Sequence, residues 1–165
     1  MITPTIDGLP EVIADLRRRL AALERPRGTG TRPSGSWMLV TPLTLPKDTL
    51  VTLTPWDAHH DPVGMSVDND TGVFTFGRAG WWTLMCSIRA TASVRYLMFI
   101  DPPTGGSRIK TSNSGGLNLT VTGPLWMERG QTLTVDAFSV GTQASVVAEH
   151  AVDDVPVFTA VYLGR

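Results

Sequence analysis

The sequence predicts an all-β sandwich or jelly roll over residues 37 to 165. Short runs rich in Val, Thr, Leu and aromatic residues alternate with period two in this region. Turn signals separate the runs at close spacing, among them Asp70-Thr71-Gly72 and Arg129-Gly130. No stretch here has a helical period, so packed sheets without helices are the simplest architecture.

The expected strands follow from these runs. They lie near residues 37–41, 50–54, 63–67, 73–76, 81–90, 94–100, 117–122, 132–138, 144–149 and 157–163. In the run 81–90, Cys86 shares one face with Trp82 and Leu84, which indicates a small core residue rather than a nucleophile. A single cysteine also excludes an internal disulfide framework and a cysteine-based zinc cluster.

A heptad pattern precedes the strands. Pro10 suits a first helical turn and Pro26 ends the pattern, so we expect a helix over residues 10 to 25. Its seam must pack either on the chain's own domain or on copies of itself. The spacing of Arg19 and Glu24 suits an interchain ion pair and favours a coiled coil. The seam consists of Leu9, Ile13, Leu16, Leu20 and Leu23.

The chain thus divides into an N-terminal anchor (1–9), the helix (10–25), a linker (26–36) and a head (37–165). The linker is rich in Pro, Gly, Ser and Thr and lacks apolar residues. Ile2 and Ile6 continue the apolar spacing, but the Pro and Gly around them disfavour a helix. Such a segment needs a partner to offset its ordering entropy, so we expect these two residues to attach the chain to a different protein.

The charge balance excludes several partners. A net charge of -1 gives no electrostatic reason to expect nucleic acid or an anionic membrane. No run approaches the ~20 apolar residues of a membrane-spanning helix. Arginines 17 to 19 interrupt the apolar run at residues 9 to 23, so we expect no signal peptide and assembly in a cytoplasm.

The strand at 94–100 is apolar on both faces. A sandwich strand normally carries polar residues outward, so a cover over its outer face is expected. We expect Tyr96, Leu97 and Phe99 to form a subunit interface of a trimeric head.

The stretch at 70–76 reads DTGVFTF, and AGWW follows at 79–82. This arrangement resembles the signature of the C1q/TNF-like jelly-roll family. The later segments 125–133 (LWMERGQTL) and 157–163 (VFTAVYL) are similar to elements of the same family. The resemblance covers residues 37 to 165 and implies a compact trimer of ten-stranded jelly rolls. We carry over the fold and the trimer from the family, and no ligand site. A coiled coil stands where many members carry a collagen-like stalk, and Trp81-Trp82 replaces the usual tyrosines.

Polar clusters give little indication of chemistry. Asp57, His59, His60 and Asp61 could bind a divalent metal, but neighbours in an extended chain point to opposite sides. An exposed turn between two prolines is the simpler interpretation, so we expect no metal and no cofactor. His150 precedes Asp153 and Asp154, but no nucleophile motif, phosphate loop or dinucleotide fingerprint accompanies them. The sequence therefore predicts a protein that is not an enzyme.

A short coiled coil, a Gly/Pro linker and a C1q-like head together resemble small minor tail or fibre proteins of phages that infect actinobacteria. We therefore expect a homotrimeric virion protein, assembled in the host cytoplasm, docked on other virion structural proteins through its N-terminus. A capsid-surface decoration trimer is an alternative. Two further classes are an adhesin that binds a host surface glycan or receptor, and a hydrolase of a host envelope polymer.

The domain division predicts that the head folds without the helix. Deleting residues 1 to 30 should leave a soluble, β-rich trimer, as circular dichroism and light scattering can establish. That trimer should no longer join its assembly. An unfolded product would show instead that the helix packs on the sandwich.

Overall fold

The computed structural model describes residues 32–165 except 93, 102–105, 113–116 and 148–156. The predicted coiled-coil seam and the two isoleucines of the N-terminal anchor lie outside this range, as do His150, Asp153 and Asp154. Within it, the chain forms thirteen β-strands and no helix. The prediction of an all-β head is therefore confirmed. No helix long and apolar enough to span a membrane occurs among the described residues.

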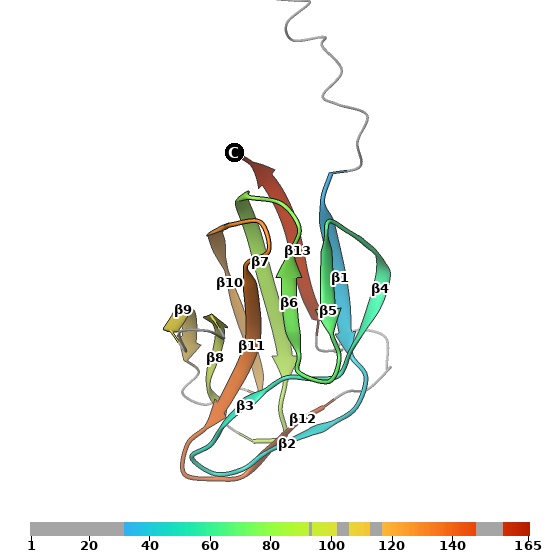
Figure 1. The fold of residues 1–165 in the computed structure, drawn as a ribbon. Helices are drawn as coiled ribbons and strands as arrows, with labels where there is room; N and C mark the ends of the chain where they lie inside the picture. The colour runs from blue at the N-terminus through green and yellow to red at the C-terminus, as the bar shows by residue number, and fades with distance from the viewer. Residues whose placement is uncertain (1–31, 93, 102–105, 113–116, 148–156) are drawn as a thin grey trace, which may run out of the picture. The chain divides into compact units, whose positions relative to one another are not determined.

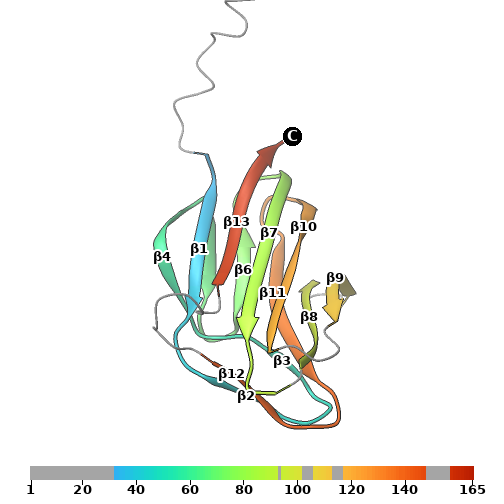
Figure 2. The same cartoon turned by 180° about the vertical axis from the view of Figure 1, so that it is seen from behind.

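The strands form two main antiparallel sheets that pack face to face (Figure 1). Seen from behind, the first sheet lies in front (Figure 2). Its spatial order is β10 (Asn118–Met127), β7 (Gly80–Arg89), β13 (Val157–Gly164), β1 (Ser34–Leu39) and β4 (Trp56–Val63). Since β13 pairs with both β7 and β1, the last strand lies at the centre of this sheet.

The second sheet has β11 at its centre. Its order is β5 (Met65–Asp68), β6 (Val73–Phe76), β11 (Thr132–Ser139), β8 (Val94–Asp101) and β9 (Gly106–Ser112), with β3 (Leu50–Thr52) also paired to β11. A short third sheet joins β2 (Leu43–Leu45) to β12 (Ala144–Val146) at the end of the sandwich away from the C-terminus (Figure 1).

Three strands were not predicted. β2 and β9 are short or glycine-flanked, and β4 contains the polar cluster that we expected to be an exposed turn. β4 forms because it pairs with β1 along the edge of the first sheet, where irregular register accommodates its unusual sequence. Tertiary pairing has overridden local composition there.

Aromatic rings from both sheets fill the core. Phe74 of β6 lies 4.2 Å from Phe158 of β13 and 5.1 Å from Trp37 of β1, measured between ring centroids. Trp56 of β4 packs on the same group. All four side chains are buried, and they join the two sheets across the sandwich. Cys86 is also fully buried, and burial raises the pKa of its thiol, which confirms it as a core residue.

Two glycines of the C1q/TNF-like signature have backbone reasons to be glycine. Gly72 has φ 69° and Gly80 has φ 147°, both in the region that side-chain-bearing residues rarely adopt. A Cβ at Gly80 would also lie 2.5 Å from the ring of Tyr162. These positions fix the turns before β6 and β7 and so set the register of the core strands.

Asp136 is a buried carboxyl group on β11, and only 5% of the residue is exposed. The hydroxyls of Thr52 and Thr134 hydrogen-bond to it, but its Oδ1 atom has no partner. Burial outweighs these bonds and raises the pKa of Asp136 above its ordinary value. The folded state therefore holds this proton more tightly than the unfolded state does. The stability that the group contributes is present at low pH and is lost as pH rises through the folded pKa.

Replacing Asp136 with Asn should therefore stabilise the head at pH 7. The amide keeps the shape and can still bond to both threonines, but it carries no charge to desolvate. We expect a gain of ~1 kcal/mol, which corresponds to a melting temperature higher by about 2–4 °C for a domain of this size. Thermal melts at pH 7 and pH 3.5 test this, because the gain should disappear at the lower pH. A variant less stable than wild type at both values would contradict the account.

Candidate functional surface

The outer face of the first sheet is almost free of charge. We use this name for the outward positions of four adjacent strands, β10, β7, β13 and β1 (Figure 2). Alternate residues of each strand enter the core, and the residues between them form the face. Arg89, at one end of β7, is the only charged residue in this set. The set is Asn118, Thr120, Thr122, Pro124 and Trp126; Trp81, Thr83, Met85, Ser87 and Arg89; Val157, Thr159, Val161 and Leu163; Ser34, Ser36 and Met38.

Large apolar side chains are exposed on this face. Trp81 is 46% exposed, Met85 40%, Trp126 38% and Leu163 48%. Trp81 and Trp126 are paired across β7 and β10, and their ring centroids lie 5.8 Å apart in an edge-to-face arrangement. Large apolar groups gathered on one sheet face are typical of a surface that another protein covers.

Five hydroxyl groups of the face have partners within the sheet, those of Ser36, Ser87, Thr120, Thr122 and Thr159. Ser87 and Thr120 share a hydrogen bond at 3.0 Å between β7 and β10. The Thr122 hydroxyl donates to the carbonyl oxygen of Leu84 at 3.1 Å. Because these groups do not depend on water, burial of the face would leave few polar atoms unsatisfied.

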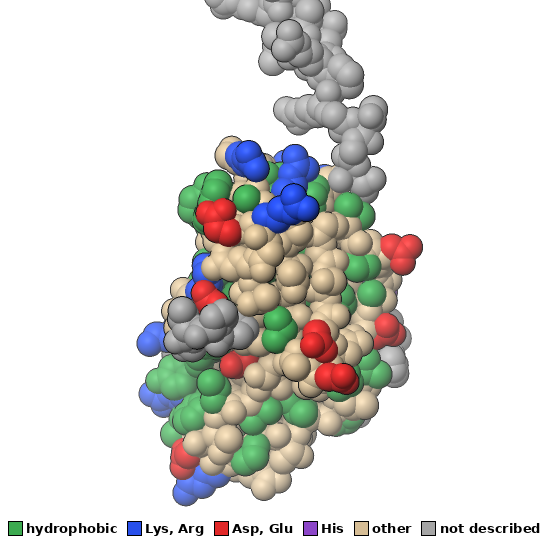
Figure 3. Space-filling view, viewed as in Figure 1, with side chains coloured by type: hydrophobic (Ala, Val, Ile, Leu, Met, Phe, Trp, Pro, Cys, Tyr) green, Lys and Arg blue, Asp and Glu red, His purple; other side chains and the backbone are tan. Residues whose placement is uncertain are grey.

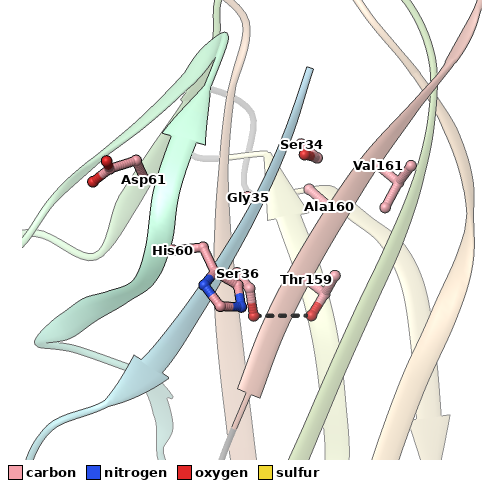
Figure 4. A pocket seen from close by; sticks show the side chains of 8 residues that line it. All are labelled: Ser34, Gly35, Ser36, His60, Asp61, Thr159, Ala160 and Val161. Atoms are coloured by element: carbon pink, nitrogen blue, oxygen red, sulfur yellow. Dashed lines mark hydrogen bonds between the residues drawn. The ribbon is translucent and has the colours of Figure 1, made fainter. Parts of the chain in front are cut away.

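A shallow depression of about 240 Å³ lies on the same face where β1 meets β4 and β13 (Figure 4). Ser36 shares a hydrogen bond with Thr159 at 3.4 Å there, and the His60 ring lies beside them. Asp61 points away from this group (Figure 4). The depression offers hydroxyls and one imidazole, which suit contact with polar groups of a partner.

The polar cluster of Asp57, His59, His60 and Asp61, for which we expected no metal, lies on the exposed strand β4. The rings of His59 and His60 are close, with centroids 4.3 Å apart. Among the described residues, no group of three or more His, Cys, Asp or Glu side chains is arranged to hold a metal ion. A site with at most two imidazoles differs from the four-ligand geometry of structural zinc.

The predicted trimer interface is placed wrongly in two of its three residues. Leu97 and Phe99 are 0% exposed and belong to the core of the single chain, so they have no surface to bury against another copy. Tyr96 is half-buried on the outer side of β8, near the Phe138 ring. The strand is apolar on both faces because Leu97 and Phe99 face the other sheet while Tyr96 packs beside β11. Trp56 is also fully buried, so its ring offers no stacking surface for a glycan.

The sequence does contain a signal for the apolar outer face of the first sheet. Residues 117–127, 157–163 and 80–88 contain no charged side chain on either face, whereas the strand at 94–100 contains Arg95. Three strands without charge at their outward positions indicate a covered face more strongly than one strand that is apolar on both faces. Only the topology shows that these strands are neighbours.

Comparison with known proteins places the fold. No protein-family model matches the sequence, and no curated protein is significantly similar to it. Solved structures match across the head, however. Eiger TNF from S. frugiperda has a TM-score of 0.56 at 12% identity, covering 81% of this chain and 94% of that chain. Vertex protein P5 of the phage PRD1 has a TM-score of 0.59 at 10% identity, covering 82% and 99%.

The globular domain of zebrafish complement 1qA protein also matches, with a TM-score of 0.50 at 16% identity, covering 82% of this chain and 99% of that chain. The sheet order and these similarities together define a TNF/C1q-like jelly roll. The fold that the resemblance implied is confirmed.

Proposed function

We propose that this protein is a non-enzymatic, trimeric structural component of a phage particle, whose heads associate through the outer face of the first sheet. One observation carries the proposal: a four-strand face that lacks charge over most of its extent and exposes Trp81, Met85, Trp126 and Leu163. In an isolated chain these apolar side chains would stay in contact with water, which is unfavourable.

Association through this face is energetically reasonable. Burial of a large apolar side chain from full exposure contributes ~1.5–3 kcal/mol. Four side chains of the face are 38–48% exposed in each chain, so completing their burial contributes a little under half of that for each one. Five of the threonine and serine hydroxyls are bonded within the sheet, and Arg89 can stay at the rim. The contact therefore has few polar groups to desolvate.

The fold and the N-terminal heptads support three copies. The resemblance to the C1q/TNF-like family implies three subunits, and the predicted seam at Leu9, Ile13, Leu16, Leu20 and Leu23 would join the same copies. A helix of about 16 residues is marginal alone, so the heads supply most of the association energy.

The place in the particle is the finer part of the proposal. We assign the protein to a minor tail or fibre, attached through the segment that contains Ile2 and Ile6, with the head outward. The similarity to P5, a vertex protein of PRD1, favours the alternative of a trimer on the capsid surface. Both places share a structural role and differ in the protein that holds the N-terminus.

An adhesin of another class would use the paired rings of Trp81 and Trp126 as a stacking platform for a glycan. That role requires the pair to stay exposed in the assembled protein. The oligomeric proposal requires it to be covered, so the state of this face separates the two.

Replacing Met85 with Lys tests the interface. Met85 lies on β7 at the middle of the face, where it is cross-strand neighbour to both Thr122 and Thr159. Because burial of an unpaired ammonium group is costly, we expect the variant to be a folded monomer of 17.8 kDa. Light scattering at micromolar concentration should give three times that mass for the wild type.

Leu50→Lys is the matched control. Leu50 is 48% exposed and lies on β3, away from the proposed interface, so the same charge should leave the trimer intact. A wild-type monomer, or a Met85→Lys variant that remains trimeric, would overturn the assignment of the interface.

A further inference from the structure

Four arginines lie at the end of the head where β13 ends. Arg78 is in the turn between β6 and β7, Arg129 is in the turn between β10 and β11, Arg32 precedes β1, and Arg165 follows β13. All four are exposed. We call this group the arginine end.

Three contacts place these segments together. The Arg78 guanidinium lies 4.8 Å from the centre of the Tyr162 ring, and the Tyr162 amide donates to the carbonyl of Pro33, next to Arg32. The amide of Gly130, next to Arg129, donates to the carbonyl of Phe76, near Arg78. The four positive charges therefore belong to one surface.

The charge at this end is largely unbalanced. Glu128 is the only carboxylate side chain on the same segments, and it accepts a hydrogen bond from the Trp126 indole at 2.7 Å. Within the described part of the chain, none of the four arginines forms an ion pair. Figure 3 shows blue side chains gathered at this end of the molecule, with a red one beside them.

We propose that the arginine end binds a carboxylate-bearing protein surface. Arginine is the residue that pairs with carboxylates through a planar fork, and it is enriched at protein interfaces while lysine is depleted. The end contains arginine and no lysine. Glu128 among the arginines argues against a uniformly charged phosphate backbone, which it would repel. A protein surface with separate carboxylates can place other groups opposite it.

The proposed function supplies the context. Residues 1 to 31 are continuous with the head at Arg32, so the segment that the virion protein would hold enters the head at this end. The arginine end then contributes the second contact with that protein. A trimer would present three copies of it, and simultaneous contacts strengthen attachment without any new type of bond.

The test uses the full chain and a fluorescent peptide of Glu-Ala-Ala repeats, in which neutral residues separate the carboxylates as on a protein surface. The Arg78→Gln, Arg129→Gln double variant should weaken binding roughly three- to tenfold, since each exposed ion pair contributes ~0.2–1 kcal/mol. Binding by the wild type should also weaken as salt is raised. Fluorescence anisotropy measures both.

Arg95→Gln, Lys110→Gln is the matched control, because it removes the same charge from exposed positions on β8 and β9. Arg95 also lies over a tyrosine ring, as Arg78 does.

Unchanged binding by the control supports the proposal. Equal loss in both double variants would overturn it, as would an absence of peptide binding. Binding of duplex DNA that depends on Arg78 and Arg129, without peptide binding, would assign the surface to nucleic acid instead. Light scattering on the same samples tests the trimer separately.

Discussion

The packing of Phe74 against Phe158 and Trp37 is the contact on which the rest of the head depends. It joins β6 of the second sheet to β13 and β1 of the first, and all three rings are buried. Once alternate residues of β13 and β1 are committed to this core, the residues between them must point outward. The composition of the outer face is therefore fixed by the same register that builds the core.

That register explains why the outer faces of the two sheets differ in composition. The second sheet keeps charged residues at outward positions, such as Arg95 on β8, and it buries Asp136 at some cost to stability. The first sheet presents hydroxyls that are bonded to their neighbours, together with large apolar groups. A face of this composition can lose its water without leaving charges unpaired, which makes it the natural contact between copies.

The head could be predicted from sequence where one strand face enters the core. Alternation located β6, β7 and β13, and the signature glycines at 72 and 80 indicated the correct fold family because their backbone requires glycine. β4 could not be predicted, since its polar residues form a strand only through pairing with β1. The candidate interface was also missed. Apolarity alone does not say whether Leu97 and Phe99 face another copy or the other sheet, and only the topology decides this.

The central claim is that another copy covers the outer face of the first sheet in solution. In a single chain Met85 is 40% exposed, whereas Met98 on β8 is half-buried and therefore less exposed than Met85. Brief oxidation by dilute peroxide, followed by mass spectrometry of peptides, compares the two methionines in one sample. The account predicts slower oxidation at Met85 than at Met98, because Met85 lies at the middle of the contact. Faster oxidation at Met85, in line with its exposure in the isolated chain, would contradict the claim.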